Sequence, residues 1–501
     1  MISSQVANIT PSSLLRRASQ LVGVIACSIC GHATSAESWK PDGIARNDRV
    51  ALRKKFMTVV LTANWTSPRH RRTVNWVTAL TMLAVVFTGY DLVVYGTILS
   101  VLTSDPTQIG PISPGEAGAL GSYAVIGVGV GALVSGAVGD HLGRRRMMLI
   151  SIVWFSVGIA TTALSTNVGS FGLARLATGF AVGGLTTTAT AMVADFAPSG
   201  KRNLYNAVVC SGVPVGGVLA AFMAIVLRDA IGWRGMFWIG VSPLAVLLPL
   251  ALVRLPDSPQ WLIARGRADL ATVVSHRTGI PLPATQAEED LSGGEKSGFV
   301  ALFTRRYAWG TVFLGLMSFV GLLLTYGLNT WLPKIMEDVG FNAKGSLTFL
   351  LVLNGAAVLG GILASRIADA VGPKRVIVAT FFLAAFSLTL LTVRLPLPAL
   401  LAAVAVAGVG TMGTQTLVYG FASNYYSVAA RGAGVAWCAA VGRLGGISGP
   451  LIGGALLSTG FAATTFYVFA AVAVVGASLT LFVPNSDDDR DISISENEAL
   501  R

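Results

Sequence analysis

The sequence is poor in charge and in cysteine. Only 12% of its residues are charged, about half of the roughly 25% that soluble domains carry. Cys210 and Cys438 lie alone in apolar stretches, and Cys27 and Cys30 form one Cys-x-x-Cys pair with no second pair nearby. A lone pair is not the ligand set of a zinc site, and separated cysteines do not make a disulfide framework. The composition therefore argues against a zinc-binding protein and against a small protein held together by disulfides.

Signatures of catalysis and of nucleotide binding are also missing. The four histidines, at positions 32, 70, 141 and 276, show no metal-ligand spacing, and the sequence contains no Walker loop. Residues 1–74 hold 11 Lys/Arg and 3 Asp/Glu, so most of the net charge of +12 precedes the first apolar segment. This placement does not suggest a nucleic-acid surface. We expect no enzyme activity, no metal, no cofactor and no nucleic-acid partner.

Apolar residues and glycine are abundant instead. Hydrophobic residues make up 53% of the chain, and there are 57 glycines, which let helices approach closely in lipid. A hydrocarbon core of roughly 30 Å is crossed by about 20 helical residues. Segments of that kind predict an all-α membrane protein with twelve transmembrane helices. They lie near 75–101, 116–138, 147–166, 170–193, 203–227, 233–253, 307–331, 345–367, 374–393, 396–420, 432–454 and 461–483.

Basic residues are distributed unevenly over the connections. With a cytoplasmic N-terminus, the inner connections carry 16 Lys/Arg and the outer ones 5. The positive-inside rule therefore predicts a multi-pass protein of the cell inner or plasma membrane, with both termini cytoplasmic. The predicted parts are a basic, disordered leader (1–74), an N-terminal six-helix bundle (75–253), a cytoplasmic linker (254–306), a C-terminal six-helix bundle (307–485) and an acidic cytoplasmic tail (486–501).

The two halves repeat with an offset of 229 residues. This offset aligns Gly139–Arg146 with Ala368–Arg375, and Arg202 with Arg431. A constant offset over several segments implies two pseudo-symmetric bundles related by a parallel repeat. In such proteins the substrate site lies between the bundles near the midplane of the membrane.

The leader allows two interpretations. Arg16-Arg17 followed by Leu21–Ile29 is similar to a short secretory signal, but a cleaved signal conflicts with a cytoplasmic N-terminus. We favour a disordered or artificially extended leader, with Met57 as a natural start. A chain that begins at Met57 is then expected to insert and function normally.

Two charged residues inside apolar segments are the main candidates for function. Asp91 is the lone carboxylate or basic group between Trp76 and Leu102, where a charge costs roughly 2.5–3.5 kcal/mol on insertion scales. We therefore expect Asp91 to handle protons. Arg175, in the fourth apolar segment, either couples to Asp91 within the bundle or extends to the membrane interface.

Arg443 lies about eleven residues into the eleventh apolar segment, and its repeat partner is Pro214. A planar guanidinium suits two-pronged capture of a carboxylate. The alternative is a structural arginine that pairs with a backbone carbonyl or with Asp91. Further polar or aromatic residues in apolar segments either bind the substrate or make helix–helix hydrogen bonds. They are Tyr95, Tyr326, Asn329, Gln415 and Tyr419.

The polar turn Gly139–Arg146 lies between two apolar segments. Its charges could form pairs that break when the protein changes between two states, or it could simply be a basic cytoplasmic turn. We favour gating because the repeat copy keeps the same pattern of charges. The predicted gating residues are Asp140, Arg144, Arg145, Asp195, Arg202, Asp369, Lys374 and Arg375.

Several of these motifs together resemble the major facilitator superfamily over residues 75–485. The motifs are the turn Gly139–Arg146, Arg175–Gly179 with Gly183-Gly184, Asp195–Pro198 followed by Lys201-Arg202, and Pro256–Leu262.

Three other segments, Gly89–Gly96, Tyr326–Pro333 and Gly442–Pro450, resemble the aromatic acid:proton symporter family, whose members import benzoate-like acids. The first-helix motif of that family usually has two acidic residues, whereas here Thr88 replaces the first and only Asp91 matches.

The leading hypothesis is a monomeric, proton-coupled importer of a small aromatic carboxylate that works by alternating access. The runner-up is a symporter of the same superfamily for a sugar, a dicarboxylate or an osmolyte. A third possibility is a membrane sensor that binds its ligand without transporting it. The charge of Arg443 favours an anionic substrate over a sugar.

Overall fold

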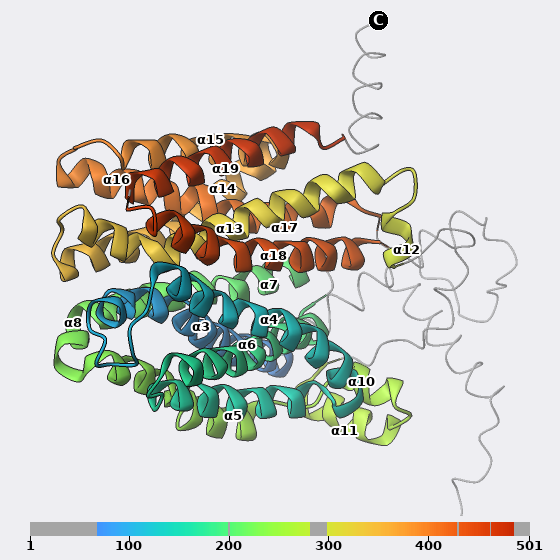
Figure 1. Cartoon of the computed structure of the whole chain (residues 1–501). Helices are drawn as coiled ribbons and strands as arrows, with labels where there is room; N and C mark the ends of the chain where they lie inside the picture. Colours follow the sequence, from blue (N-terminus) through green and yellow to red (C-terminus); the bar gives the residue numbers. More distant parts are fainter. Residues whose placement is uncertain (1–67, 199–200, 281–297, 428–429, 461, 485–501) are drawn as a thin grey trace, which may run out of the picture. The chain divides into compact units, whose positions relative to one another are not determined.

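Long helices make up the part of the chain that the computed structural model describes (Figure 1). This part comprises residues 68–198, 201–280, 298–427, 430–460 and 462–484. The predicted leader up to residue 67, linker residues 281–297 and the acidic tail from residue 485 lie outside it. The helices are α3 (Pro68–Ser104), α4 (Pro114–Leu142), α5 (Arg144–Ala163), α6 (Val168–Phe196), α7 (Arg202–Cys210), α8 (Gly212–Gly240), η3 (Ser242–Leu244), α9 (Leu247–Arg254), α10 (Pro259–Ala264), α11 (Ala268–Thr278), α12 (Phe299–Leu302), α13 (Ala308–Asp338), α14 (Ala343–Val371), α15 (Pro373–Leu390), α16 (Leu397–Gly408), η5 (Val409–Gly413), α17 (Thr414–Tyr425), α18 (Arg431–Leu457) and α19 (Ala462–Phe482).

The twelve predicted crossings agree with the helices. Eleven helical segments of the described residues are long and apolar enough to span a membrane, and one of them, Leu204–Arg254, has 51 residues. At 1.5 Å per residue this segment would measure about 75 Å, more than twice the hydrocarbon core. Gly232 interrupts it with φ 68° and ψ 178°. The segment therefore turns at Gly232 and supplies the fifth and sixth crossings.

The first helix begins at Pro68 rather than at residue 75. Proline is well suited to the first turn of a helix, because the backbone donor that it lacks would have no partner there. Arg69, Arg71 and Arg72 follow and continue the helix as polar turns. Hydropathy detects only the apolar part of a helix, so the predicted leader boundary at residue 74 was too late.

The predicted repeat is visible in the helix bounds. The offset of 229 carries the bounds of α4 onto those of α14, and the start of α7 onto the start of α18. Gly143 and Gly372 follow α4 and α14 with φ of 94° and 99°. A side chain is strained at such positive φ values, so both copies of the turn require glycine.

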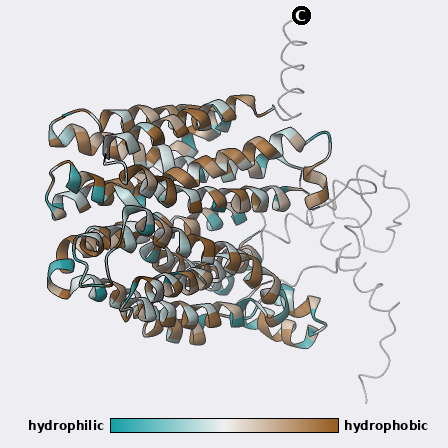
Figure 2. Ribbon diagram, in the orientation of Figure 1, coloured by the Kyte–Doolittle hydropathy of each residue, from teal (hydrophilic) through white to brown (hydrophobic). Residues whose placement is uncertain are grey.

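The helices form two bundles. Helices α3 to α9 pack among themselves, and so do α13 to α19, while α4 with α18, α8 with α14 and α3 with α13 join the bundles (Figure 1). Large apolar side chains such as Leu133 and Leu359 are 75% and 73% exposed. Figure 2 shows hydrophobic residues along most of the long helices. Such exposed apolar surface is expected of helices that face lipid.

Glycine brings α13 and α18 into backbone contact. A Cβ at Gly445 would collide with the backbone oxygen of Phe319, whereas a Cβ at Gly432 would meet no heavy atom within 4 Å. We therefore expect Gly445→Ala to lower the stability by about 1–3 kcal/mol, because the helices must separate. The matched control, Gly432→Ala, should leave stability unchanged or slightly raised. Thermal unfolding in detergent measures both, and equal melting temperatures would contradict the packing argument.

Candidate functional site

A buried ion pair joins α3 to α6. Arg175 donates from Nη1 to Oδ1 of Asp91 at 2.7 Å and to the backbone oxygen of Asp91 at 3.2 Å. The side chains of Arg175 and Asp91 are 1% and 0% exposed. Oδ2 of Asp91 and Nε of Arg175 have no hydrogen-bond partner. Of the two alternatives for Arg175, the structure thus shows the pairing with Asp91 and not the interfacial position.

Tyr95 lies beside this pair. The guanidinium carbon of Arg175 is 5.5 Å from the centre of the Tyr95 ring, a geometry typical of a cation–π contact. The hydroxyl of Tyr95 donates to the backbone oxygen of Ala117 at 2.6 Å. The hydroxyl of Tyr95 is thus engaged, and its buried ring contacts Arg175. The role of Tyr95 in substrate binding stays a prediction.

Arg443 has a different environment. It is half-buried in α18, about 18 Å from the start of that helix at 1.5 Å per residue. Among the described residues it has neither an ion pair nor a hydrogen bond. Its electrostatic neighbour is Tyr419 of α17, which in turn interacts with Tyr326 of α13. The cation thus lies at mid-depth beside phenol groups and without a counter-ion.

A small polar cluster continues from Tyr419. Gln415 donates from Nε2 to the Ser318 hydroxyl at 2.8 Å, and both groups lie within reach of the Tyr419 hydroxyl. The π-helical turn η5 ends at Gly413, two residues before Gln415. Such turns are frequent at functional sites. The ring of Tyr326 packs beside Gly446 of α18. Arg443, Tyr419, Gln415, Ser318 and Tyr326 form what we call the cation cluster.

Asn329 lies outside the cation cluster. It accepts a hydrogen bond from Asn354 Nδ2 at 2.9 Å and donates to the Thr325 carbonyl at 2.8 Å. Oδ1 of Asn354 is buried without a partner and lies against Gly217 of the other bundle. Sequence reasoning missed Ser318 and Asn354. A polar side chain inside an apolar segment is the signal that could have found them.

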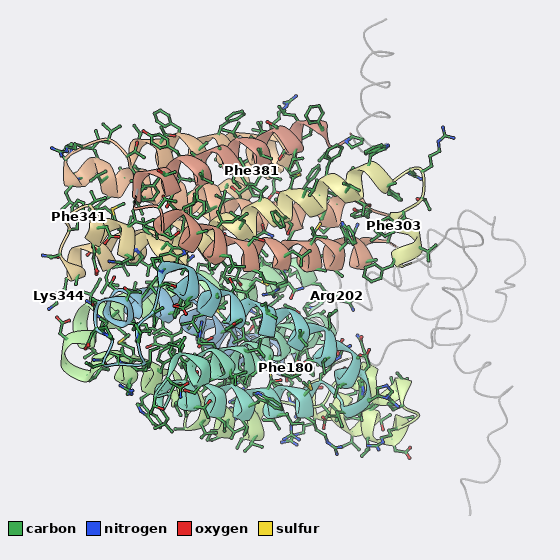
Figure 3. All side chains as sticks on the ribbon, viewed as in Figure 1. Phe180, Arg202, Phe303, Phe341, Lys344 and Phe381 are labelled. Carbon is green, nitrogen blue, oxygen red and sulfur yellow. The ribbon has the colours of Figure 1, made fainter. Side chains whose placement is uncertain are left out.

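The two bundles make close contacts near one end of the helices. Lys344 at the start of α14 lies 3.2 Å from Asp229 of α8, and Figure 3 places Lys344 at the boundary between the bundles. Ser122 donates to the backbone oxygen of Ile447 at 2.7 Å. A Cβ at Gly118 would lie 2.6 Å from the Pro450 oxygen. Gly118 and Ser122 both lie in the first half of α4, toward the end at which that helix begins.

The charged turn after α4 lies at the opposite end. Arg144 is 3.3 Å from Asp140 and 4.0 Å from Asp195, while Arg145 is 4.0 Å from Asp257. The Trp261 indole donates to the Asp140 carbonyl at 2.8 Å. The predicted gating residues of this half are thus connected to the linker helix α10, and none of these contacts crosses to the other bundle.

The repeat copy of the turn has different contacts. Lys374 donates to the backbone oxygen of Val483 at 2.7 Å. Asp369 and Arg375 are exposed and have no ion pair among the described residues. Arg202 is also exposed, and it interacts electrostatically with Asp195. The charge pattern is therefore repeated, but among the described residues Asp369 and Arg375 make no counterpart of the ion pairs of Asp140 and Arg145.

Comparisons with known proteins agree with this architecture. The family model described as "Major Facilitator Superfamily" matches residues 81–369 and 345–499. A gentisate transporter of Corynebacterium glutamicum is 33% identical over 404 residues, which are 80% of this chain and 85% of that protein. A benzoate transport protein of Acinetobacter baylyi is 31% identical over 427 residues, 82% of this chain and 90% of that protein.

A solved structure shares the fold at lower identity. The xylose transporter XylE from E. coli, in a partially occluded inward open conformation, superposes with a TM-score of 0.63 at 19% identity, covering 82% of this chain and 100% of that one. The family model, the two-bundle fold and the relatives agree, and the chain belongs to the major facilitator superfamily, as a multi-pass membrane transporter.

Proposed function

We propose that this transporter imports a small aromatic carboxylate together with protons. The relatives named for gentisate and benzoate support the substrate class. The observation that carries the proposal is Arg443, a half-buried cation at mid-depth with no partner among the described residues. A charge at this depth is costly, and such charges usually pair with another group or mark the pathway of a substrate or an ion. An anionic substrate would supply the missing counter-charge.

The neighbours of Arg443 suit an aromatic anion. The carboxylate would accept two parallel hydrogen bonds from the guanidinium, and the Tyr419 hydroxyl could donate a third. Tyr326, beside Gly446, offers an aromatic face for the ring, in an offset or edge-to-face contact. The proposed substrate residues are therefore Arg443, Tyr326, Gln415 and Tyr419, with Asn329 more distant.

Asp91 would carry the proton. Its Oδ1 is bound by Arg175, and its Oδ2 has no partner, so Oδ2 is the atom available for a proton. Protonation would remove the negative charge and weaken the pair with Arg175. The substrate carboxylate would compensate the charge of Arg443 before the bundles move. Protonation of Asp91 would leave the buried Arg175 without its counter-ion, and this unpaired charge would favour a rearrangement of the pair.

Tyr95 could transmit this change to the other bundle. A Cβ at Gly121 would lie 3.2 Å from the Tyr95 ring, 3.2 Å from Pro450 and 3.6 Å from Thr330. The tyrosine that supports Arg175 therefore reaches the place where α13 and α18 approach α4. A shift of Arg175 would act on this contact through the ring.

The inter-bundle contacts support an alternating-access cycle. The bundles meet near Asp229 and Lys344. This end of the helices would face outward in the orientation that the positive-inside rule favours, with a cytoplasmic N-terminus. We therefore propose that the structure corresponds to a state closed to the outside, with both termini cytoplasmic, and that the protein acts as a monomer in the plasma membrane without a cofactor. Rocking of the bundles would separate these contacts.

Uptake into proteoliposomes with an imposed pH gradient tests this function. Labelled benzoates, hydroxybenzoates, sugars and dicarboxylates form the panel. We expect an aromatic acid to accumulate when the outside is acidic, and accumulation to stop when an ionophore removes the gradient. Accumulation of a sugar or a dicarboxylate alone would contradict the aromatic substrate, and gradient-independent accumulation would contradict proton coupling.

Arg144→Gln should slow transport without weakening substrate binding. Arg144 lies between Asp140 and Asp195 at the proposed inner side. Its loss would therefore change the populations of the inward-closed and inward-open states and leave the cation cluster unaltered. We expect a several-fold lower maximal rate, since populations shift by the free energy of the lost pairs. Arg146→Gln is the matched control, because Arg146 is exposed and makes no ion pair with a described residue. An equal effect of both variants would mean that the transport rate depends on the total positive charge of the turn and not on the ion pairs of Arg144.

A further inference from the structure

An open groove lies at the beginning of α3, far from the cation cluster. Its volume is about 560 Å³, and it is lined by Pro68, Arg71, Arg72, Asn75, Trp76 and Ala79. Among the described residues, the lining contains two arginines and no acidic residue. Neither arginine has a hydrogen bond or an ion pair with any described residue, and both are exposed. The described part of the lining is therefore basic.

A third cation borders the groove from another helix. The guanidinium carbon of Arg254, the last residue of α9, is 4.8 Å from the centre of the Trp76 ring. This contact holds the charge of Arg254 against Trp76, which belongs to the lining of the groove. Tryptophan is enriched at the boundary between headgroups and hydrocarbon. The three arginines thus lie at the level where α3 enters the membrane.

Apolar surface continues from the groove toward the membrane interior. Ala79, one turn after Asn75, belongs to the lining. Helix α9 packs against α3, and its Leu252 and Val253 are 49% and 70% exposed. A ligand in this groove would therefore find cationic donors at one end and exposed hydrocarbon at the other.

We propose that the groove binds the headgroup of an anionic phospholipid. The phosphodiester would accept paired hydrogen bonds from Arg71 and Arg72, a geometry that guanidinium groups favour. The acyl chains would lie on Ala79 and the exposed face of α9. Free phosphate would use only the arginines, whereas a lipid uses both parts of the surface. The inference is independent of the transported substrate.

Native mass spectrometry of the full-length protein tests the proposal. Phosphatidylglycerol is titrated against phosphatidylcholine with the same acyl chains. We expect tighter binding of phosphatidylglycerol, and a loss of about thirtyfold in its affinity in the Arg71→Gln/Arg72→Gln variant, as for two arginines at a charged membrane surface. Binding of phosphatidylcholine should not change. The single variants replace the double variant if the latter does not fold.

Arg277→Gln/Arg305→Gln is the matched control. It removes two exposed arginines that lie outside the groove and should retain the affinity of the unaltered protein. Unchanged binding of phosphatidylglycerol to the groove variant, or equal losses in both variants, would overturn the site. Displacement of the lipid by inorganic phosphate at similar concentration would show an anion site instead of a lipid site.

Discussion

Replacing Arg443 with alanine should remove most of the affinity for the aromatic acid, by about a hundredfold or more. Truncating one partner of a partly buried charge pair typically costs 2–5 kcal/mol, because the other charge loses its partner. Arg443 makes no ion pair with another described residue, so its loss should leave no protein carboxylate unpaired. We therefore expect the variant to fold, with a melting temperature close to that of the unaltered protein.

Arg443→Lys makes the prediction sharper. Lysine keeps the positive charge but loses the planar, two-pronged geometry, so it should bind the acid nearly as poorly as alanine does. Isothermal titration or equilibrium binding in detergent measures both variants. Arg431→Ala, at the exposed first position of α18, is the control and should bind normally. Normal binding by Arg443→Lys would contradict the two-pronged contact, and normal binding by Arg443→Ala would move the substrate elsewhere.

The helices could be predicted from sequence because their signals are local. Twenty apolar residues in a row identify a span, and the offset of 229 found the repeat before any contact was known. One boundary was wrong because hydropathy does not measure it: the basic turns of α3 before residue 75 are helical although they are polar. The break between the fifth and sixth spans was predicted from the apolar segments, and the structure forms it with the positive φ of Gly232.

The site could be predicted only as a set of unusual residues. A charge in an apolar segment is conspicuous, which identified Asp91, Arg175 and Arg443. The partner of such a charge depends on the rotation and depth of another helix, and a local stretch of sequence does not determine these. The hydroxyl of Tyr95 bonds to a carbonyl 22 positions away, and Ser318 meets Gln415 across 97 positions.

The state of the transporter is likewise a property of packing. The contacts of Gly118 with Pro450 and of Asp229 with Lys344 join residues that no sequence motif links. The ion pair of Asp229 and Lys344 is exposed and contributes little by itself. In the proposed outward-closed state, closure would therefore depend mainly on the close approach of glycine-rich helices.

Asp91→Asn should abolish accumulation of the substrate driven by a proton gradient. Asparagine has nearly the shape of aspartate but cannot gain and lose a proton in this cycle. Arg175 would then be buried without its counter-ion, which costs about 3–5 kcal/mol of stability. The double variant Asp91→Asn/Arg175→Gln removes that unpaired charge. We expect it to recover stability but not accumulation.

Exchange across the membrane separates coupling from movement of the bundles. Labelled substrate inside proteoliposomes should still exchange with unlabelled substrate in the double variant, because exchange needs no net proton transfer. Asp105→Asn, in the connection after α3 and outside the ion pair, is the control and should accumulate substrate normally. Accumulation by Asp91→Asn across pH 5.5–8 would exclude Asp91 from coupling. Loss of exchange in a stable double variant would instead assign the pair of Asp91 and Arg175 to the movement itself.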